Sequence, residues 1–174
     1  MSDRFQSQWN ELQSIFAEHL DEVITRHVSA KGCEDVQVYL ADLLLKFQHT
    51  DQIFAVKNSA GDRLISVTEM LPEGDVRLNA ESFDRERQVH RHIGDFILFW
   101  AGVYPEFLRH IKLDLGKDIV CDYPRQARES YGFVSTFTLP PYDDEAPTFR
   151  KLSDGFDDFA FCLQVVGQRL RLNA

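Results

Sequence analysis

The chain has 174 residues, of which 28 are acidic and 19 are Lys or Arg, so its formal net charge is −9. A hydrophobic fraction of 44% with 14 Phe exceeds that of a disordered chain, and the length suits one domain, 1–174, that buries about 70% of its unfolded surface. The acidic balance argues against binding to nucleic acid, because a phosphate backbone requires a basic face.

The first ten residues, MSDRFQSQWN, contain neither the basic nor the apolar segment of a secretory signal peptide. The three cysteines, Cys33, Cys121 and Cys162, are widely spaced and form no CxxC motif. This pattern is typical neither of a disulfide framework nor of a zinc site. We therefore expect a cytoplasmic protein with reduced cysteines.

Apolar residues at helical spacing predict two amphipathic helices in the first third of the chain. The first should span residues 5–28. The second should begin at Glu34 and Asp35, because acidic residues favour the positive end of a helix dipole. The apolar stripes are Phe5, Trp9, Leu12, Phe16, Leu20 and Val23 in the first helix, and Val36, Leu40, Leu43, Leu44 and Phe47 in the second.

Residues 53–71 are compatible with two structures. The segment 58–62, NSAGD, is a turn cluster, and its flanks IFAV and RLISV suit a β-hairpin. Alternatively, Asp62 caps a helix that ends at Pro72. We favour the helix, whose apolar face would consist of Leu64, Val67 and Leu71.

Residues 82–101 should form a buried helix at the centre of the fold. Ser82 is a good N-cap, because its hydroxyl oxygen can accept from the free amides of the first turn. Five large apolar residues in a row, from Phe96 to Trp100, leave no face for water. The uncharged run 96–104 is far shorter than the ~20 residues that span a bilayer, so we expect no membrane segment.

The polar side of this central helix carries Arg87, Arg91 and Asp95. Arg91 and Asp95 are four residues apart, a spacing at which opposite charges pair on a helix. Such a pair explains Asp95 without a catalytic role.

Three further helices are expected after Gly102, a residue type that commonly ends helices. A short one begins at Pro105, another begins at Pro124, and a long one spans residues 148–172. The segment 139–147, LPPYDDEAP, should be a rigid acidic connector. The apolar stripe of the last helix consists of Phe149, Leu152, Phe156, Phe159, Leu163, Val166 and Leu170, whereas Phe161 lies on its back as a candidate oligomer contact.

Three segments carry a resemblance to a known family. They are YLADLLLKF at 39–47, IGDFILFWAGVYPEFL at 93–108 and the Phe-rich last helix. Together they resemble an uncharacterised bacterial family of small helical proteins. The resemblance implies a bacterial source and a helical fold, and it supplies no functional residues.

Two Glu-x-x-x-His pairs are the candidate catalytic residues, Glu86 with His90 and Glu106 with His110. Each pair places a carboxylate one helical turn from an imidazole, which suits proton transfer or two metal ligands. Glu86 lies close to the apolar face, so its pair is the better candidate. Because this spacing is common in helices, an ordinary structural pair is the simpler interpretation.

Signals for a metal or a cofactor are weak. None of the six histidines follows a Glu by three residues, as in di-iron helical bundles, and no Walker, GxGxxG or GxSxG motif occurs. We predict no metal and no cofactor.

The sequence therefore predicts an all-α, single-domain bundle of about six or seven helices. Two classes of function remain compatible with it. The first is a non-enzymatic interaction or regulatory module with a protein partner or a second copy. The alternative is a small-ligand or metal-assisted enzyme with a site near Glu86 and His90.

Overall fold

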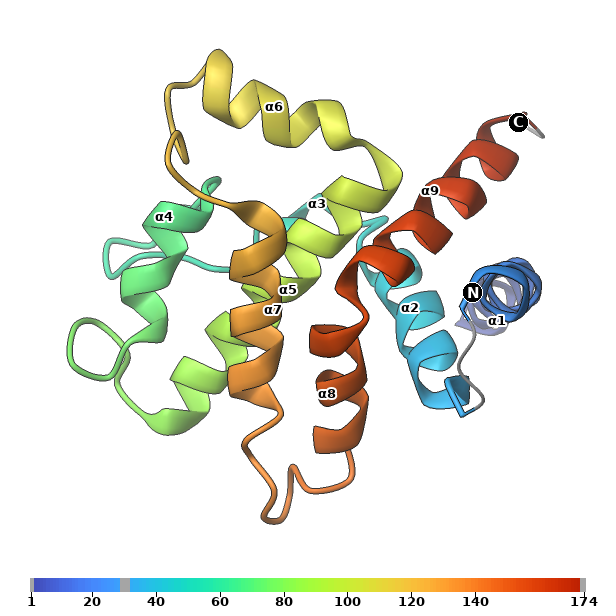
Figure 1. Ribbon diagram of the computed structural model, residues 1–174, viewed down its shortest axis with the longest axis horizontal. Helices are drawn as coiled ribbons and strands as arrows, with labels where there is room; N and C mark the ends of the chain where they lie inside the picture. Colours follow the sequence, from blue (N-terminus) through green and yellow to red (C-terminus); the bar gives the residue numbers. More distant parts are fainter. Residues whose placement is uncertain (1, 29–31, 173–174) are drawn as a thin grey trace.

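Figure 1 shows the computed structural model of the protein, which describes residues 2–28 and 32–172. These residues contain no β-strand, only an isolated bridge between Lys57 and Arg63, so the predicted all-α class is confirmed. The helices are α1 (Ser2–His27), α2 (Glu34–Lys46), α3 (Thr50–Ile53), α4 (Val67–Met70), the 3-10 helix η1 (Leu71–Gly74), α5 (Phe83–Val103), α6 (Pro105–Leu113), α7 (Tyr123–Val134), α8 (Ala146–Asp154) and α9 (Phe156–Leu172).

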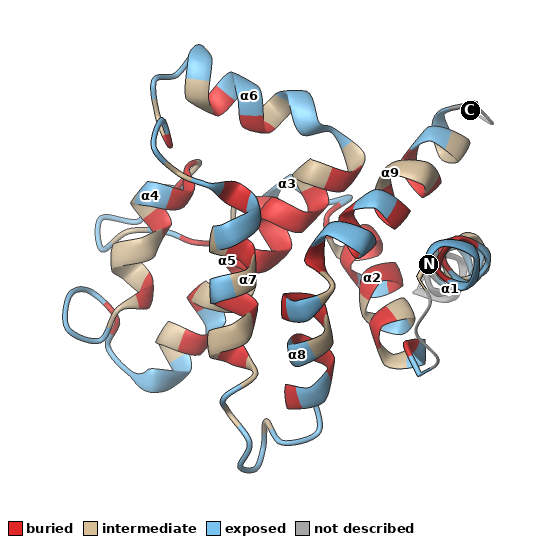
Figure 2. Cartoon of the chain, viewed as in Figure 1, coloured by how far each residue is buried: buried red, intermediate tan, exposed pale blue. Residues whose placement is uncertain are grey.

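Helix α5 is the central element, as predicted. Ser82 is its N-cap, and the Ser82 Oγ accepts a hydrogen bond of 3.1 Å from the backbone N–H of Arg85. The helix packs chiefly against α7 and α9, and the buried colour covers much of it in Figure 2. The apolar run from Phe96 to Phe99 is buried, which confirms its interpretation as core.

Two glycines bring the neighbouring helices close to α5. A Cβ at Gly94 would lie 2.6 Å from a ring carbon of Tyr131, and one at Gly102 would lie 2.4 Å from the Cβ of Leu163. Both separations are too short for any side chain. Gly102 lies inside the helix, which ends at Val103, so its role is close packing on α9 and not helix termination.

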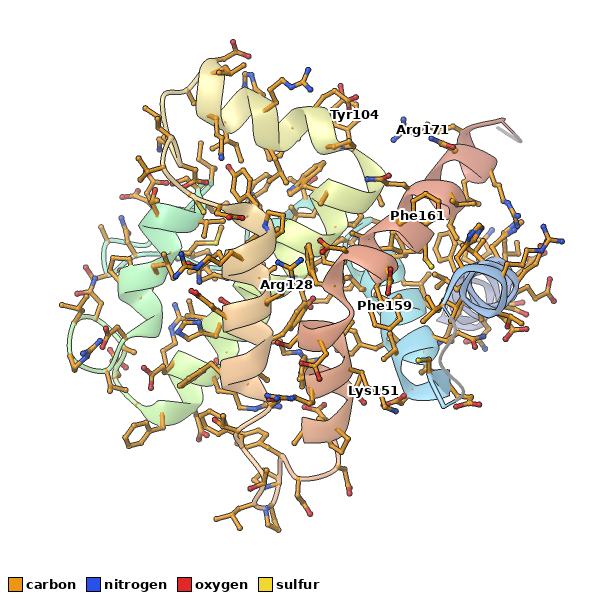
Figure 3. The ribbon with its side chains drawn as sticks, in the orientation of Figure 1. Tyr104, Arg128, Lys151, Phe159, Phe161 and Arg171 are labelled. Atoms are coloured by element: carbon orange, nitrogen blue, oxygen red, sulfur yellow. The ribbon has the colours of Figure 1, made fainter. Side chains whose placement is uncertain are left out.

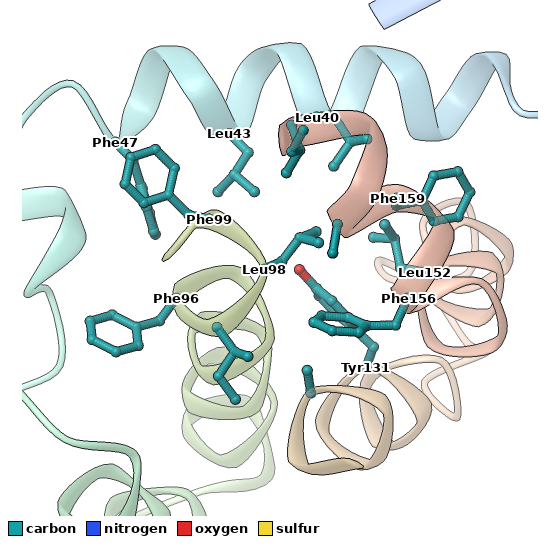
Figure 4. Close-up of a cluster of buried hydrophobic side chains, with 14 of the residues drawn as sticks. Leu40, Leu43, Phe47, Phe96, Leu98, Phe99, Tyr131, Leu152, Phe156 and Phe159 are labelled. Atoms are coloured by element: carbon teal, nitrogen blue, oxygen red, sulfur yellow. The ribbon is translucent and has the colours of Figure 1, made fainter. Parts of the chain in front are cut away.

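Figure 4 shows that aromatic rings from neighbouring segments, among them Phe47, Tyr131 and Phe156, gather around α5. Phe47 follows α2 and packs edge-on against Phe99 at a centroid distance of 5.1 Å. Tyr131 of α7 contacts Phe149 of α8 at 5.9 Å. Such edge-to-face and tilted contacts add to the stabilisation from burial alone.

The long helix predicted over 148–172 is divided in two. It ends at Asp154 and resumes at Phe156, and a Cβ at Gly155 would lie 2.9 Å from the ring of Phe159. Gly155 thus lets this ring pack against the backbone where the chain changes direction. With this break and the single-turn helices α3 and α4, the described residues contain nine α-helices, not six or seven.

The helix favoured over 62–71 is wrong for its first half. Helix α4 begins only at Val67, with Ser66 as its N-cap. Residues 58–62 form a turn instead, because the Asn58 side-chain oxygen accepts from the backbone N–H of Ala60 and of Asp62. The hairpin alternative is present only as the Lys57–Arg63 bridge.

The predicted stripe of α1 is buried at Phe16, Leu20 and Val23, whereas Leu12 is exposed. The side chains of Phe5 and Trp9 lie outside those that the structure describes.

Charged side chains join the C-terminal helices to the rest of the fold (Figure 3). Lys151 of α8 forms an ion pair with Asp35 of α2 at 2.8 Å. Arg128 of α7 pairs with Asp157 of α9. Pairs that are this exposed contribute little stability each, typically below about 1 kcal/mol, so burial carries the packing.

One buried carboxylate has a purely structural setting. Asp118 precedes α7 and accepts hydrogen bonds from the backbone N–H of Val67 and of Thr68, at 2.9 and 2.8 Å. The hydroxyls of Thr68 and Tyr123 also donate to it, at 2.7 and 3.0 Å. Asp118 thereby caps the start of α4 from a distant part of the chain.

Within the described residues, no helix combines the length and the apolar character needed to cross a membrane.

Candidate functional site

A cavity of about 530 Å³ lies beside α5. Its walls come from the end of α2, the segment after α3, the first half of α5 and the loop before α8. A volume of this size suits a small organic molecule. The lining residues are Lys46, Ala55, Val56, Arg85, Arg87, Gln88, Arg91, His92, Asp95, Pro141, Tyr142 and Glu145.

The lining is strongly basic in a chain whose formal net charge is −9. Four basic side chains line it, whereas two carboxylates, Asp95 and Glu145, oppose them. Arg87 and Arg91 are one turn apart on α5, so their guanidinium groups can act on the same ligand. We call this cavity the cationic pocket.

Arg87 is the most buried cation of the pocket, with 3% of its surface exposed. Its Nη2 donates to the Glu145 carboxylate at 2.7 Å, and its Cζ lies 3.9 Å from the centre of the Tyr142 ring. Its Nε has no hydrogen-bond partner in the part of the chain that the structure describes. An unpaired buried N–H costs about 1–3 kcal/mol.

Asp95 lies at the bottom of a hydrogen-bonded network. It is 2% exposed, and one of its oxygens accepts from the hydroxyls of Tyr39 at 2.6 Å and Tyr131 at 2.9 Å. The Nε of Arg91 donates to the Tyr39 hydroxyl at 3.2 Å. The predicted direct pair between Arg91 and Asp95 is therefore wrong, because Tyr39 stands between them and Arg91 lies 3.6 Å from Glu145.

Burial and neighbouring charges shift the pKa values of the groups in this network. Burial raises the pKa of Asp95 above its ordinary value, although Arg91 and the two tyrosine hydroxyls oppose that rise. Burial and the charge of Asp95 also raise the pKa of Tyr39 and Tyr131, so both phenols stay protonated and act as donors.

His92 is held as a neutral imidazole. Burial and, to a smaller extent, the charges of Lys46 and Arg85 lower its pKa to about 4, although a hydrogen bond with the Ile53 backbone opposes them. Its Nε2 is buried without a partner among residues 2–28 and 32–172, so the Ile53 bond belongs to Nδ1. A neutral ring that donates through Nδ1 offers a free lone pair at Nε2.

The predicted pair Glu86 and His90 lies outside the cationic pocket. Both side chains are half-buried, and His90 contacts the α7 side of the helix. The His90 Nδ1 lies 3.2 Å from the Ser130 Oγ, and its ring packs 4.6 Å from the Phe133 ring. Burial lowers the pKa of His90, and Glu86 partly opposes this.

The second predicted pair is on the surface. Glu106 and His110 are both exposed on α6, and the His110 Nδ1 lies 2.7 Å from Asp114. The imidazole thus pairs with a carboxylate one turn after it, not with Glu106.

No group of three or more His, Cys, Asp or Glu side chains in the described ranges could hold a metal ion. The cationic pocket, with guanidinium and ammonium groups on its walls, favours an anion instead.

The sequence analysis singled out some of the lining residues but did not predict the cavity that they form. The sequence places Arg87, Arg91 and Asp95 on the polar side of α5, and the structure adds His92 to them in the pocket lining. The signal was the density of arginine beside an aromatic run in an acidic chain. The segment 139–147, interpreted as a connector, supplies Tyr142 and Glu145.

Comparison with models of protein families, with curated proteins and with solved structures gives no match for this chain. The resemblance to a bacterial helical family therefore stays a prediction.

Proposed function

We propose that the protein is a non-enzymatic regulatory or binding module whose cationic pocket takes a small anionic molecule. The observation that carries this proposal is Arg87, a residue of the pocket lining that is 3% exposed and whose Nε has no hydrogen-bond partner among the described residues. A buried cation of this kind is costly unless an anion accompanies it.

Among the residues that the structure describes, Arg87 forms its ion pair with Glu145. Glu145 is about half exposed, and it is shared with Arg91, which lies 3.6 Å away. One carboxylate thus faces two guanidinium groups, each of which can hold an anion through two parallel hydrogen bonds. A ligand anion would complete this set.

An enzyme is the second candidate, and Asp95 favours it. This carboxyl lines the pocket, is buried, and has a raised pKa, the properties of a group that transfers protons. The enzyme alternative thereby moves from Glu86 and His90 to Asp95.

A second copy of the chain is a separate proposal for the surface of α9. Phe161 is 47% exposed and packs edge-on against His27 at 5.1 Å. Figure 3 shows it on α9. A native mass above 20.2 kDa that falls in Phe161→Asp supports the oligomer, and a monomeric wild type contradicts it.

The test of the proposed function is calorimetric titration of the purified protein with inorganic phosphate, sulfate and acetate at constant ionic strength. We expect one site per chain for at least one of these anions. Arg91→Gln should weaken the affinity for that anion by about tenfold or more, because one charge-assisted hydrogen bond contributes about 1.5–3 kcal/mol.

Arg150→Gln is the matched control. Arg150 lies on α8, is 66% exposed, and does not line the pocket, so this variant loses the same charge elsewhere. Equal weakening in both variants, or no binding of any anion, would contradict the proposal. Chemical conversion of a bound ligand, lost in Asp95→Asn, would favour the enzyme alternative.

A further inference from the structure

We infer that the ligand of the cationic pocket is a small soluble phosphate monoester whose organic part carries a hydroxyl group. This inference rests on the proposed function and adds the chemical class of the ligand. It follows from the charge of the pocket, the arrangement of its cations and the state of His92.

The charge of the pocket fits a dianion. Lys46, Arg85, Arg87 and Arg91 face only two carboxylates, so an excess of two positive charges remains even when both acids are ionised. A phosphate monoester carries about −1.5 to −2 charges at pH 7, which neutralises that excess. A ligand with a single carboxylate would leave one of the two excess positive charges without a counterion.

The cations also approach from more than one direction. Arg87 and Arg91 project from adjacent turns of α5, whereas Lys46 comes from the last turn of α2. A planar carboxylate is satisfied by one guanidinium fork. A phosphate group presents three terminal oxygens in different directions, so it can use two arginines and a lysine together.

His92 indicates the rest of the ligand. Its Nε2 lone pair is buried and has no partner within the described part of the chain, and a phosphate dianion has no hydrogen to donate to it. A hydroxyl on the organic part would supply that hydrogen. The apolar residues Ala55, Val56 and Pro141 in the same wall can cover the carbon atoms of such a molecule.

The cavity volume limits the size of this molecule. About 530 Å³ holds a small phosphorylated alcohol or sugar rather than a folded partner. The proposed ligand is therefore a small soluble ester and not a membrane lipid.

The experiment compares three probes by calorimetry. Glycerol 3-phosphate has the dianion and the hydroxyl groups, ethyl phosphate has the dianion alone, and glycerate has hydroxyl groups with a single carboxylate. We expect glycerol 3-phosphate to bind most tightly and glycerate at least tenfold more weakly, with ethyl phosphate between them.

The variant His92→Phe tests the hydroxyl. It should remove the difference in affinity between glycerol 3-phosphate and ethyl phosphate. Lys46→Gln, at a half-buried position, should weaken both phosphates alike. An unchanged difference between the two esters in His92→Phe would overturn the assignment of the hydroxyl.

The pH dependence separates a dianion from a monoanion. The second pKa of a phosphate monoester is about 6, so affinity should rise by about tenfold between pH 5 and pH 7. Sulfate stays a dianion over this range, so its titration reports any change in the groups that face the ligand. These groups are Lys46, Arg85, Arg87, Arg91, His92, Asp95 and Glu145.

The outcomes distinguish the two proposals. Glycerate that binds as tightly as glycerol 3-phosphate would overturn the phosphate class and leave an anion pocket. Binding of phosphatidic acid vesicles without binding of glycerol 3-phosphate would overturn the soluble ligand. If none of the probes, phosphate, sulfate or acetate binds, the proposed function itself fails.

Discussion

Two buried polar regions of this protein differ in one respect that separates structure from function. Around Asp118, two backbone amides and two hydroxyls donate to a single carboxylate. Around the cationic pocket, Arg87 Nε and His92 Nε2 lack partners in the described part of the molecule. The first region is complete without a ligand, and the second is not.

The difference follows from what each buried group costs. A satisfied buried carboxylate stabilises the fold by tying distant segments together, here residues 67–68 and 118–123. An unsatisfied buried donor or acceptor destabilises it by about 1–3 kcal/mol. Sites of binding or catalysis commonly hold such groups, and in the described residues Trp100 Nε1 is a further one that does not line the pocket.

The largest expected effect is loss of the satisfied carboxylate. Asp118→Ala should lower the free energy of unfolding by about 4 kcal/mol, because buried donors lose their acceptor and Ala must adopt a backbone φ of 54°. Chemical denaturation measures this loss. Asp118→Asn tolerates the backbone and keeps one acceptor oxygen, so it should lose only about half as much.

Anion affinity is the control for this prediction. Asp118 does not line the cationic pocket, so Asp118→Asn should bind phosphate like the wild type below its unfolding midpoint. A parallel loss of affinity would show that the two regions are not independent.

The next effect in size is a pH dependence from His92. Its folded pKa of about 4 lies below the ordinary value of 6.5, so folding favours the neutral ring. The resulting stability is fully present above pH 6.5 and is lost as the pH falls toward 4. Its magnitude is on the order of 3 kcal/mol.

His92→Gln isolates this contribution. Compared with the wild type, the variant should lose less stability between pH 6.5 and pH 4 in urea denaturation. The lowered pKa of His90 acts in the same direction, so some acid sensitivity should persist. Identical pH profiles for the two proteins would contradict the neutral, buried state of His92.

A smaller effect is expected at Arg87 in spite of its deep burial. Arg87→Met removes the unpaired Nε and leaves Glu145 free to be hydrated, because that carboxylate is about half exposed. Replacement of a buried ion pair by an apolar side chain is often neutral. The unfolding free energy should change by less than about 1 kcal/mol while anion binding is lost.

That result would contrast directly with Asp118→Ala. A loss of 3 kcal/mol or more in Arg87→Met, similar to the loss of the structural carboxylate, would instead identify Arg87 as part of the scaffold.

The smallest effect concerns the predicted pair on the other side of α5. Glu86→Gln should change the free energy of unfolding by less than about 0.5 kcal/mol, because Glu86 is only half-buried and influences His90 through charge alone. Titration of His90 by NMR should show a slightly lower pKa in the variant. Loss of anion binding in Glu86→Gln would return the candidate site to this pair.

The sequence predicts the central helix and the buried faces of several other helices. Local signals, such as the Ser82 cap and the apolar run after Asp95, identified α5 because cap geometry and helical periodicity depend on neighbouring residues. Apolar stripes predicted the buried faces of α2, α8 and α9 for the same reason.

The pocket could not be predicted because it depends on contacts between distant segments. Tyr39 and Asp95 are 56 residues apart, and Arg87 and Glu145 are 58 apart. Sequence spacing suggested an Arg91–Asp95 pair on one helix, but the Tyr39 hydroxyl from α2 intervened. The break at Gly155 was missed likewise, since it serves the ring of Phe159 after the turn.

The most direct test of the central claim is the ¹H–¹⁵N NMR signal of the Arg87 Nε–H group, assigned by its absence in Arg87→Lys. We predict that this signal shifts as glycerol 3-phosphate is added, with saturation at one ligand per chain. A signal that stays unchanged at a ligand concentration that saturates the calorimetric site would contradict the claim. It would mean that the unpaired Nε of Arg87 is not where the protein binds its ligand.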